Sequence, residues 1–266
     1  IYSDKNGNLF DPYNGKKDLE SGNINFIGDS ENRIKEDYLR ILRYVRFFIN
    51  YSNQSHDLNI IKKIKKNIGG VSKLSSERLL DEFKKLTKSN AFLKIFNDKV
   101  SLELIEIIFP QLKNLENFKK LNSYALDNLS KVDFIFLLSL LIVDGTDNTD
   151  YFLYKFNISK KDQKRIKNID NFYKEKINSK TFTENNMNKT FYYLGKQSTF
   201  DILNHRIVKL NKEDSVLKEL VKHYEIMDIP KMPINADFLM KKYKIPEGKH
   251  LGEKLKIIEK EWVKNN

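Results

Sequence analysis

Apolar residues recur at helical spacing from about Ser30 almost to the end of this 266-residue chain, and strand-like alternation is nearly absent after residue 28. The pattern runs through 31–51, 57–68, 75–89, 100–112, 131–143, 161–177, 198–211, 213–227 and 251–265. The polar stretches 178–188 and 227–234 separate some of these segments. The chain is also long enough to bury a sizeable core. We therefore predict a mainly α, multi-helical fold.

The first residues have a different pattern. In "IYSDKNGNLFDP", the apolar pairs around Tyr2 and around Leu9-Phe10 flank Asn6-Gly7, and Asn-Gly between apolar runs is a strong hairpin signal. We predict a short β hairpin here. Because the chain opens on Ile1 as if within a strand, we expect a fragment whose sheet partners lie upstream.

Composition limits the kinds of partner. Lys and Arg number 48 against 36 Asp and Glu, so the formal charge is +12, which favours a polyanionic partner such as nucleic acid. A genome rich in A and T also enriches a protein in Lys, Asn and Ile, and codon bias alone is the competing explanation. No apolar run approaches the roughly 18 residues of a membrane span. The sequence has no cysteine, which excludes a disulfide scaffold within it, and we expect a cytoplasmic protein without a signal peptide.

Arginine is scarce and clustered. The chain has seven arginines against 41 lysines, yet Arg33, Arg40, Arg43 and Arg46 fall within 14 residues. On one continuous helix over 31–51, the last three form a stripe on one side, opposite an apolar face. That face contains Ile41, Leu42, Val45, Phe48 and Ile49. A solvated face with ion pairs, such as Glu36–Arg40 at i,i+4, is the simpler interpretation.

Arginine differs from lysine by its planar fork of donors, which suits a phosphate or the edge of a base. Asp37 near Arg40 places an acceptor beside a donor. Cytosine and adenine each present an amino donor next to a ring-nitrogen acceptor, whereas guanine and uracil present the reverse. Such a pair would accept C and A and reject G and U, and the other arginines would be free to hold phosphates.

Three segments in register carry a family resemblance. Asp37-x-x-Arg40-x-x-Arg43-x-x-Arg46 resembles the nucleotide-selecting helix of class II tRNA nucleotidyltransferases, the CCA-adding enzymes, whose fold bacterial poly(A) polymerases share. Upstream, "DPYNGKKDLESGNINFIGD" is similar to the family's flexible D-x-x-x-G-x-x-D-L element, here Asp11, Gly15, Asp18 and Leu19. Downstream, "LSSERLLDEFKKL" is similar to its S-x-E-R element.

The resemblance implies a role for each matching residue. Asp37 and Arg40 would read the base, and Arg43 and Arg46 would complete the nucleotide site. Arg33 would form an entry-side ion pair, and Asp11, Gly15 and Asp18 would belong to a hinge. The supporting residues would be Glu36, Ser75, Glu77 and Arg78, with the S-x-E-R segment forming a helix that braces the selector helix.

The family's transfer chemistry uses Mg²⁺ held by carboxylates in G-S…D-x-D and R-R-D elements. Neither element occurs here, so no catalytic or metal-binding residue is assigned. The acidic stretch 144–150 is interpreted as a solvated turn, and His56, His205, His223 and His250 form no ligand pattern. We expect the Mg²⁺-binding head upstream of Ile1 and expect residues 1–266 alone to transfer no nucleotide.

The resemblance also implies a domain plan. Residues 1–28 would be a β remnant of the nucleotidyltransferase head with the hinge loop, 29–90 the nucleotide-selecting neck, 91–175 the helical body and 176–266 the tRNA-binding tail. Lysine-rich helices such as "KKDQKRIKN" suit phosphate, although amphipathic surface helices look the same. Near the C-terminus, Ala236 stands where the family usually has glycine.

The predicted function is addition of C and A to the tRNA 3′ end, with CTP and ATP as substrates and tRNA as partner. Two alternatives stay open at this point: a poly(A) polymerase that uses ATP only, and a helical RNA-binding module without catalysis. The sequence does not indicate the oligomeric state.

Overall fold

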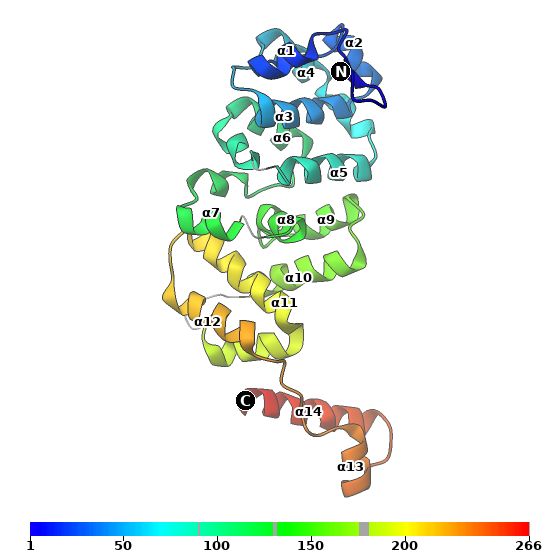
Figure 1. The fold of residues 1–266 in the computed structure, drawn as a ribbon. Coiled ribbons are helices and arrows are strands. Elements are labelled where there is room, and N and C mark those ends of the chain that lie inside the picture. Colours follow the sequence, from blue (N-terminus) through cyan, green and yellow to red (C-terminus); the bar gives the residue numbers. More distant parts are fainter. Residues whose placement is uncertain (90, 130–131, 176–180, 266) are drawn as a thin grey trace. The chain divides into compact units, whose positions relative to one another are not determined.

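The computed structural model describes residues 1–89, 91–129, 132–175 and 181–265, and it is mainly helical, which confirms the predicted fold class (Figure 1). The chain divides into two compact units. Unit 1 comprises Ile1–Lys120 and Asp133–Gln163, and unit 2 comprises Leu121–Val132 and Lys164–Asn266. In the described residues, no helix is long and apolar enough to cross a membrane. The finer division into four segments stays a prediction.

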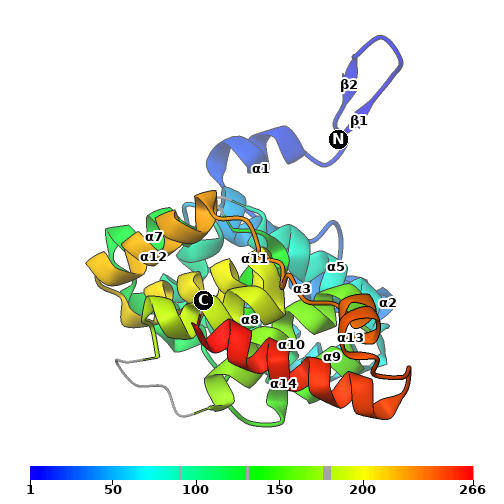
Figure 2. The same ribbon diagram turned by 90° about the horizontal axis from the view of Figure 1, so that it is seen from below.

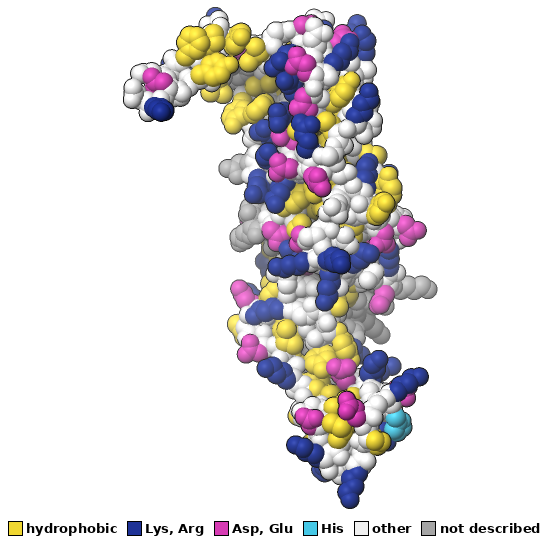
Figure 3. Space-filling view, turned by 90° about the vertical axis from the view of Figure 1, so that its right-hand side faces the viewer, with side chains coloured by type: hydrophobic (Ala, Val, Ile, Leu, Met, Phe, Trp, Pro, Cys, Tyr) yellow, Lys and Arg dark blue, Asp and Glu magenta, His cyan; other side chains and the backbone are white. Residues whose placement is uncertain are grey.

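The predicted hairpin is present in unit 1. Strands β1 (Tyr2–Ser3) and β2 (Leu9–Phe10) pair antiparallel, with Tyr2 opposite Phe10 and Ser3 opposite Leu9. Gly7 has a φ of 85° in the turn, and the Asp4 carboxylate accepts the N–H groups of Asn6 and Asn8 at 2.8 Å. The hairpin extends away from the packed helices of unit 1 (Figure 2), and its apolar side chains are exposed (Figure 3).

The other elements of unit 1 are helical. They are α1 (Gly15–Ser21), α2 (Ser30–Glu36), α3 (Leu39–Tyr51), α4 (Leu58–Asn67), η1 (Ile68–Lys73), α5 (Ser76–Thr87), η2 (Phe92–Asn97), α6 (Lys99–Ile108), η3 (Leu115–Lys120), α8 (Phe134–Ile142) and α9 (Asn148–Lys155), with η marking 3-10 helices. Polar side chains satisfy free N–H groups at several of the helix starts. The capping residues are Asp29, Asp57, Ser75, Asp98 and Asp133.

The core of unit 1 forms where α3 packs against α5 and α6. Ile41, Leu42 and Val45 of α3 are buried as predicted, and Phe83 of α5 meets Phe109 at 4.8 Å between ring centroids. These apolar contacts hold the buried face of α3 against α5 and α6. The side of α3 that bears the arginines therefore faces the surface. The expectation of a single helix over 31–51 is wrong, because α2 and α3 are separate helices with a break at Asp37.

Unit 2 contains the remaining helices. They are α7 (Ser123–Leu129), most of α10 (Lys160–Lys174), α11 (Glu184–Leu210), α12 (Ser215–Ile226), α13 (Ala236–Tyr243) and α14 (Lys249–Asn265). Helix α11 bends at Gly195, whose φ of 81° and ψ of 173° are not helical. That positive φ explains a glycine in mid-helix, because other residues rarely adopt it. Packing against α12 buries Phe191 of α11 together with Tyr224 of α12.

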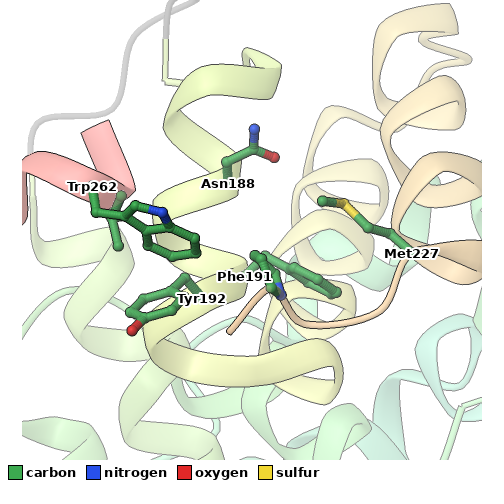
Figure 4. Close-up of a pocket in the computed structure, with 7 residues that line it drawn as sticks. Asn188, Phe191, Tyr192, Met227 and Trp262 are labelled. Atoms are coloured by element: carbon green, nitrogen blue, oxygen red, sulfur yellow. The ribbon is translucent and has the colours of Figure 1, made fainter. Parts of the chain in front are cut away.

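The C-terminal helix α14 is fastened to α11 by an aromatic contact. Trp262 meets Tyr192 at 5.5 Å between ring centroids, and the Tyr192 hydroxyl donates to Glu259 at 2.8 Å. Figure 4 shows the crevice lined by Tyr192, Trp262 and Met227, the last of which follows α12. The cavity is about 10 Å³. Because even one water needs about 10–15 Å³, this crevice is a packing seam between helices and not a ligand site.

Candidate nucleotide-binding site

The α2–α3 junction places Asp37 outside both helices. Asp37 has an extended backbone, with φ −154° and ψ 102°, and its Oδ1 accepts the N–H of Leu39 at 3.2 Å. Its carbonyl accepts the N–H of Arg40 at 3.0 Å. Aspartate favours such local hydrogen bonds over a helix interior, and here its side chain accepts the N–H of the first residue of α3. The prediction of one continuous helix through Asp37 was therefore wrong.

A close contact between Tyr38 at the α2–α3 junction and the backbone of Gly70 also stabilises this junction. The Tyr38 ring packs onto Gly70 in η1, where an added Cβ would lie 2.1 Å from a ring carbon. Glycine is needed at this position because any side chain would collide with the ring. The break between α2 and α3 therefore depends on a contact between segments far apart in the sequence.

The Asp37 carboxylate is held by α5. Nη2 of Arg78 donates to Oδ1 at 3.1 Å and to Oδ2 at 2.9 Å. Arg78 remains about half exposed, and the Asp37 side chain is 22% exposed. A carboxylate has more acceptor positions than these contacts use. Asp37 is thus oriented by Arg78 while it can still accept a hydrogen bond from a ligand.

Arg40 is held from the α2 side. Its Nη1 donates to the carbonyl of Arg33 at 2.7 Å and to Oε2 of Glu36 at 2.8 Å, so the predicted Glu36–Arg40 pair is present. Arg33 donates to the same Oε2 at 2.6 Å. These guanidinium groups, that of Arg40 first, lower the pKa of Glu36. The Nε and Nη2 groups of Arg40 make no hydrogen bond within the described residues and remain available as donors.

Arg43 and Arg46 share a carboxylate that the sequence analysis missed. Nε of Arg46 donates to Oε1 of Glu82 at 2.5 Å, and Nε of Arg43 lies 3.6 Å from Oε2. Glu82 is only 1% exposed. It lies on the buried face of α5 between Leu79 and Phe83. A carboxylate interrupting an apolar helix face was the available signal, since buried charges require a partner.

The S-x-E-R segment forms α5, which packs against α3 as the bracing prediction requires. Ser75 is the cap, and its Oγ accepts the N–H of Arg78 at 3.4 Å. Glu77 is exposed in the first turn, where a negative charge favours the helix dipole. Of this segment, Glu82 contacts the arginines of α3 and Arg78 contacts Asp37 just before α3, whereas Ser75 acts on α5 itself.

The residues predicted to form a hinge stabilise local turns around α1. The Asp11 carboxylate accepts the N–H groups of Gly15 and Lys16, both at 2.8 Å, and these bonds, that from Lys16 first, lower the pKa of Asp11. Asp18 accepts from the side chain of Asn23 at 3.1 Å, and Leu19 is exposed. A Cβ on Gly15 would lie 3.2 Å from Ile1. Whether this segment moves stays a prediction.

The histidines and the acidic 144–150 stretch do not form a metal site among the described residues. His56 lies between the Tyr44 hydroxyl at 3.0 Å and Asp98 at 2.7 Å, which ties α3 to α6. His205 is fully buried, and burial lowers its pKa to about 3. The 144–150 stretch is a turn followed by the start of α9. No group of three His, Cys, Asp or Glu residues among those described could hold a metal ion.

The lysine-rich start of α10 gives a mixed result. Its lysines Lys160, Lys161 and Lys164 are exposed, as a phosphate-binding surface requires. Arg165, by contrast, is turned inward: its Nη2 donates to Oδ1 of Asp201 at 2.8 Å, and its Nε donates to Oδ2. Ala236 begins α13 after the cap Asn235, whose side chain accepts the N–H of Phe238 at 2.9 Å.

Comparisons with known proteins identify the family of the chain. A family model described as "tRNA nucleotidyltransferase domain 2 putative" matches residues 129–266, and one described as "Probable RNA and SrmB- binding site of polymerase A" matches residues 57–116. The human mitochondrial CCA tRNA nucleotidyltransferase 1 is 27% identical over 97% of this chain and 59% of its own length. A CCA-adding enzyme of Staphylococcus haemolyticus is 26% identical over 97% of this chain and 64% of its own length.

A solved structure shows the same fold. The CCA-adding enzyme of Bacillus stearothermophilus, crystallised in complex with CTP, superposes with a TM-score of 0.74 at 18% identity, covering 99% of this chain and 66% of that chain. The chain therefore spans about 60% of the length of the curated relatives named above.

Proposed function

The chain belongs to the tRNA nucleotidyltransferase family, and we propose that it supplies base selection and RNA binding for an enzyme that adds C and A nucleotides to the 3′ end of tRNA. The observation that carries this proposal is the α2–α3 junction. There a carboxylate and a guanidinium, each oriented by a second charged side chain, stand one turn apart at the start of α3.

In the proposed site, Asp37 accepts the amino group of cytosine or adenine, and Arg40 donates to the ring nitrogen beside it. The Nε and Nη2 groups of Arg40 are the donors left for this contact. Guanine and uracil would place a carbonyl oxygen against the Asp37 carboxylate and a ring N–H against the Arg40 guanidinium. Each is a mismatch of two acceptors or two donors, and a buried polar mismatch of that kind costs about 1–3 kcal/mol. Selection of C and A therefore needs no nucleic-acid template.

The triphosphate would lie toward Arg43 and Arg46. Glu82 holds these side chains in place, and Arg43 keeps 43% of its surface exposed. Guanidinium groups match phosphate oxygens in geometry and charge. Glu36, Ser75, Glu77 and Arg78 support this site without contacting the nucleotide, and Asp11, Gly15 and Asp18 serve as the hinge.

ATP and CTP are the proposed substrates and tRNA is the proposed partner. Nucleotidyl transfer of this class uses Mg²⁺, which neutralises phosphate charge. The described residues contain no carboxylate cluster that fits such an ion, so no step of the reaction is assigned to them. The expectation of a cytoplasmic protein stays a prediction, and the human relative is by name mitochondrial.

The test is an incorporation assay on protein expressed from the full reading frame of its gene. A tRNA transcript ending at the discriminator base is supplied with Mg²⁺ and each labelled nucleotide in turn. We expect CMP to be added first and AMP after it. Incorporation confined to AMP would instead indicate a poly(A) polymerase, and tRNA binding without incorporation would indicate a non-catalytic RNA-binding module.

A further inference from the structure

Arg206 differs from the other six arginines of the chain, all of which lie in the described residues. Each of those six has a carboxylate within 4.0 Å: Arg33 and Arg40 share Glu36, Arg43 and Arg46 share Glu82, Arg78 meets Asp37, and Arg165 meets Asp201. Arg206 pairs with no carboxylate in the described part of the chain. In a sequence that uses arginine so sparingly, this residue calls for a separate explanation.

The surroundings of Arg206 form a pocket within unit 2. It lies between the C-terminal end of α11 and the start of α12, with a volume of about 270 Å³. Phe182, Leu210 and Leu217 supply apolar lining, while Arg206, Lys212 and Asp214 supply the charges. The Arg206 guanidinium lies over the Phe182 ring, 5.4 Å from its centroid. A cation stacked on an aromatic face is held in one orientation without a carboxylate to neutralise it.

The charge balance of this pocket favours an anion. Lys212 is exposed and, like Arg206, has no carboxylate within ion-pairing distance among the described residues. Asp214, the acidic group in the lining, is committed to capping α12, where its Oδ1 accepts the N–H of Leu217 at 3.1 Å. Two cations therefore face the pocket, and the carboxylate beside them is already hydrogen-bonded.

The size of the pocket favours part of a larger ligand. Pockets that enclose a whole small molecule have volumes of about 300–1,000 Å³, and this one is smaller and open to solvent. A guanidinium fork with an adjacent ammonium matches the oxygens of a phosphate. We propose that this pocket binds a backbone phosphate of RNA through Arg206 and Lys212. The inference rests on the proposed function in that the RNA is tRNA.

The experiment measures the dissociation constant of the chain for a tRNA transcript across a series of salt concentrations. Arg206→Gln and Lys212→Gln each remove a charge from the pocket. Lys254→Gln is the matched control, because Lys254 is an exposed lysine of α14 without a carboxylate partner in the described residues. Losing one phosphate contact should lower the slope of log K against log salt by about 0.7–0.9 and weaken binding about five- to tenfold near 0.1 M salt.

Arg206→Lys separates charge from geometry. It keeps the cation over Phe182 but loses the fork, so we expect a loss between those of wild type and Arg206→Gln. Thermal unfolding of each variant checks the fold. If Arg206→Gln is destabilised, the tRNA affinity of Lys212→Gln, a change at an exposed position, decides the test. A loss in the control equal to those in the pocket variants would overturn the proposal, because it would mean diffuse attraction only.

Two further measurements separate the possible sources of phosphate and the two proposals. Titration with inorganic phosphate and with CTP should show no difference between wild type and Arg206→Gln, because the pocket binds the RNA chain. A CTP affinity that falls with Arg206→Gln would contradict this. If wild type binds tRNA and the pocket variants bind it equally well, the pocket proposal alone fails. If wild type does not bind tRNA, the proposed function fails as well.

Discussion

The carboxylate of Asp37, at the break between α2 and α3, receives both of its long-range hydrogen bonds from Nη2 of Arg78 on α5, at 3.1 and 2.9 Å. Forty-one positions separate the two residues in the sequence. The proposed base-reading group is therefore oriented by a different helix from the one it begins. A second helix thus controls the direction in which Asp37 can accept a hydrogen bond.

Asp37→Ala should relax base selection more than it weakens triphosphate binding. The variant removes the acceptor for the amino group, whereas the arginines proposed to hold phosphate are untouched. We expect the preference for C and A over G and U to fall at least about tenfold, the equivalent of roughly 1.4 kcal/mol, and the KM for CTP to rise less. The measurement is competitive incorporation of the four nucleotides by protein from the full reading frame.

Asp37→Asn is the companion variant, because its side-chain oxygen can still accept the N–H of Leu39. If both variants unfold at the wild-type temperature and still discriminate normally, Asp37 does not read the base.

Glu82→Gln should destabilise unit 1. Glu82 is almost fully buried. Its Oε1 lies 2.5 Å from Nε of Arg46, and its Oε2 lies 3.6 Å from Nε of Arg43. Hydrogen bonds to charged groups contribute about 1.5–3 kcal/mol, and the partial exposure of both arginines favours the lower part of that range. Denaturant unfolding gives the free energy directly. Glu77→Gln, an exposed change on the same helix, is the control and should alter the free energy of unfolding by less than about 0.5 kcal/mol.

His205 should make the stability of unit 2 fall on acidification. Burial lowers its pKa to about 3 in the folded chain, against an ordinary value of 6.5, so below pH 6.5 the unfolded chain binds a proton that the folded chain does not. Stability contributed in this way is present above pH 6.5 and is lost as the pH falls toward 3, at up to about 1.4 kcal/mol per pH unit.

The measurement is the free energy of unfolding between pH 7 and pH 5. His205→Leu should flatten the dependence, and it also removes two ring nitrogens that have no hydrogen-bond partner among the described residues. His250→Gln, at an exposed position, should leave the dependence unchanged. An equally steep dependence in His205→Leu would mean that another group causes it.

Asp11→Ala should loosen the start of α1. Its carboxylate is the acceptor for the N–H groups of Gly15 and Lys16 at the start of α1, which have no intrahelical acceptor. Hydrogen exchange at these two amides should become about five times faster, while exchange within α3 stays the same. Unchanged exchange at both amides would show that the turn does not depend on Asp11.

Helix content and the clustering of arginine were readable from the sequence because they depend on local spacing. The buried face of α3, the Asn6-Gly7 turn and the Glu36–Arg40 pair all involve residues close together in the chain. The family motifs extended this to three segments, since their residue types and order are legible without coordinates. The ion pairs and packing contacts between these segments could not be predicted in the same way.

The break at Asp37 illustrates the limit. Apolar periodicity runs through 31–51 without a proline or a glycine, so spacing alone predicts one helix. The tertiary structure ends α2 there, because Tyr38 packs on Gly70 and Arg78 holds the Asp37 carboxylate. Glu82 follows the same rule: a carboxylate on an apolar face signals a partner, but only packing of α5 against α3 determines that the partners are Arg43 and Arg46.

The sequence by itself determined a mainly helical chain with a β hairpin, and it placed an acidic and several arginine side chains in one short segment. Only the tertiary structure decided which of those side chains are held and which keep free donors. It also left Arg206 as the arginine without a carboxylate partner in the described residues. The physical reason is that periodicity acts over a few residues, whereas an ion pair needs two surfaces that the fold brings together.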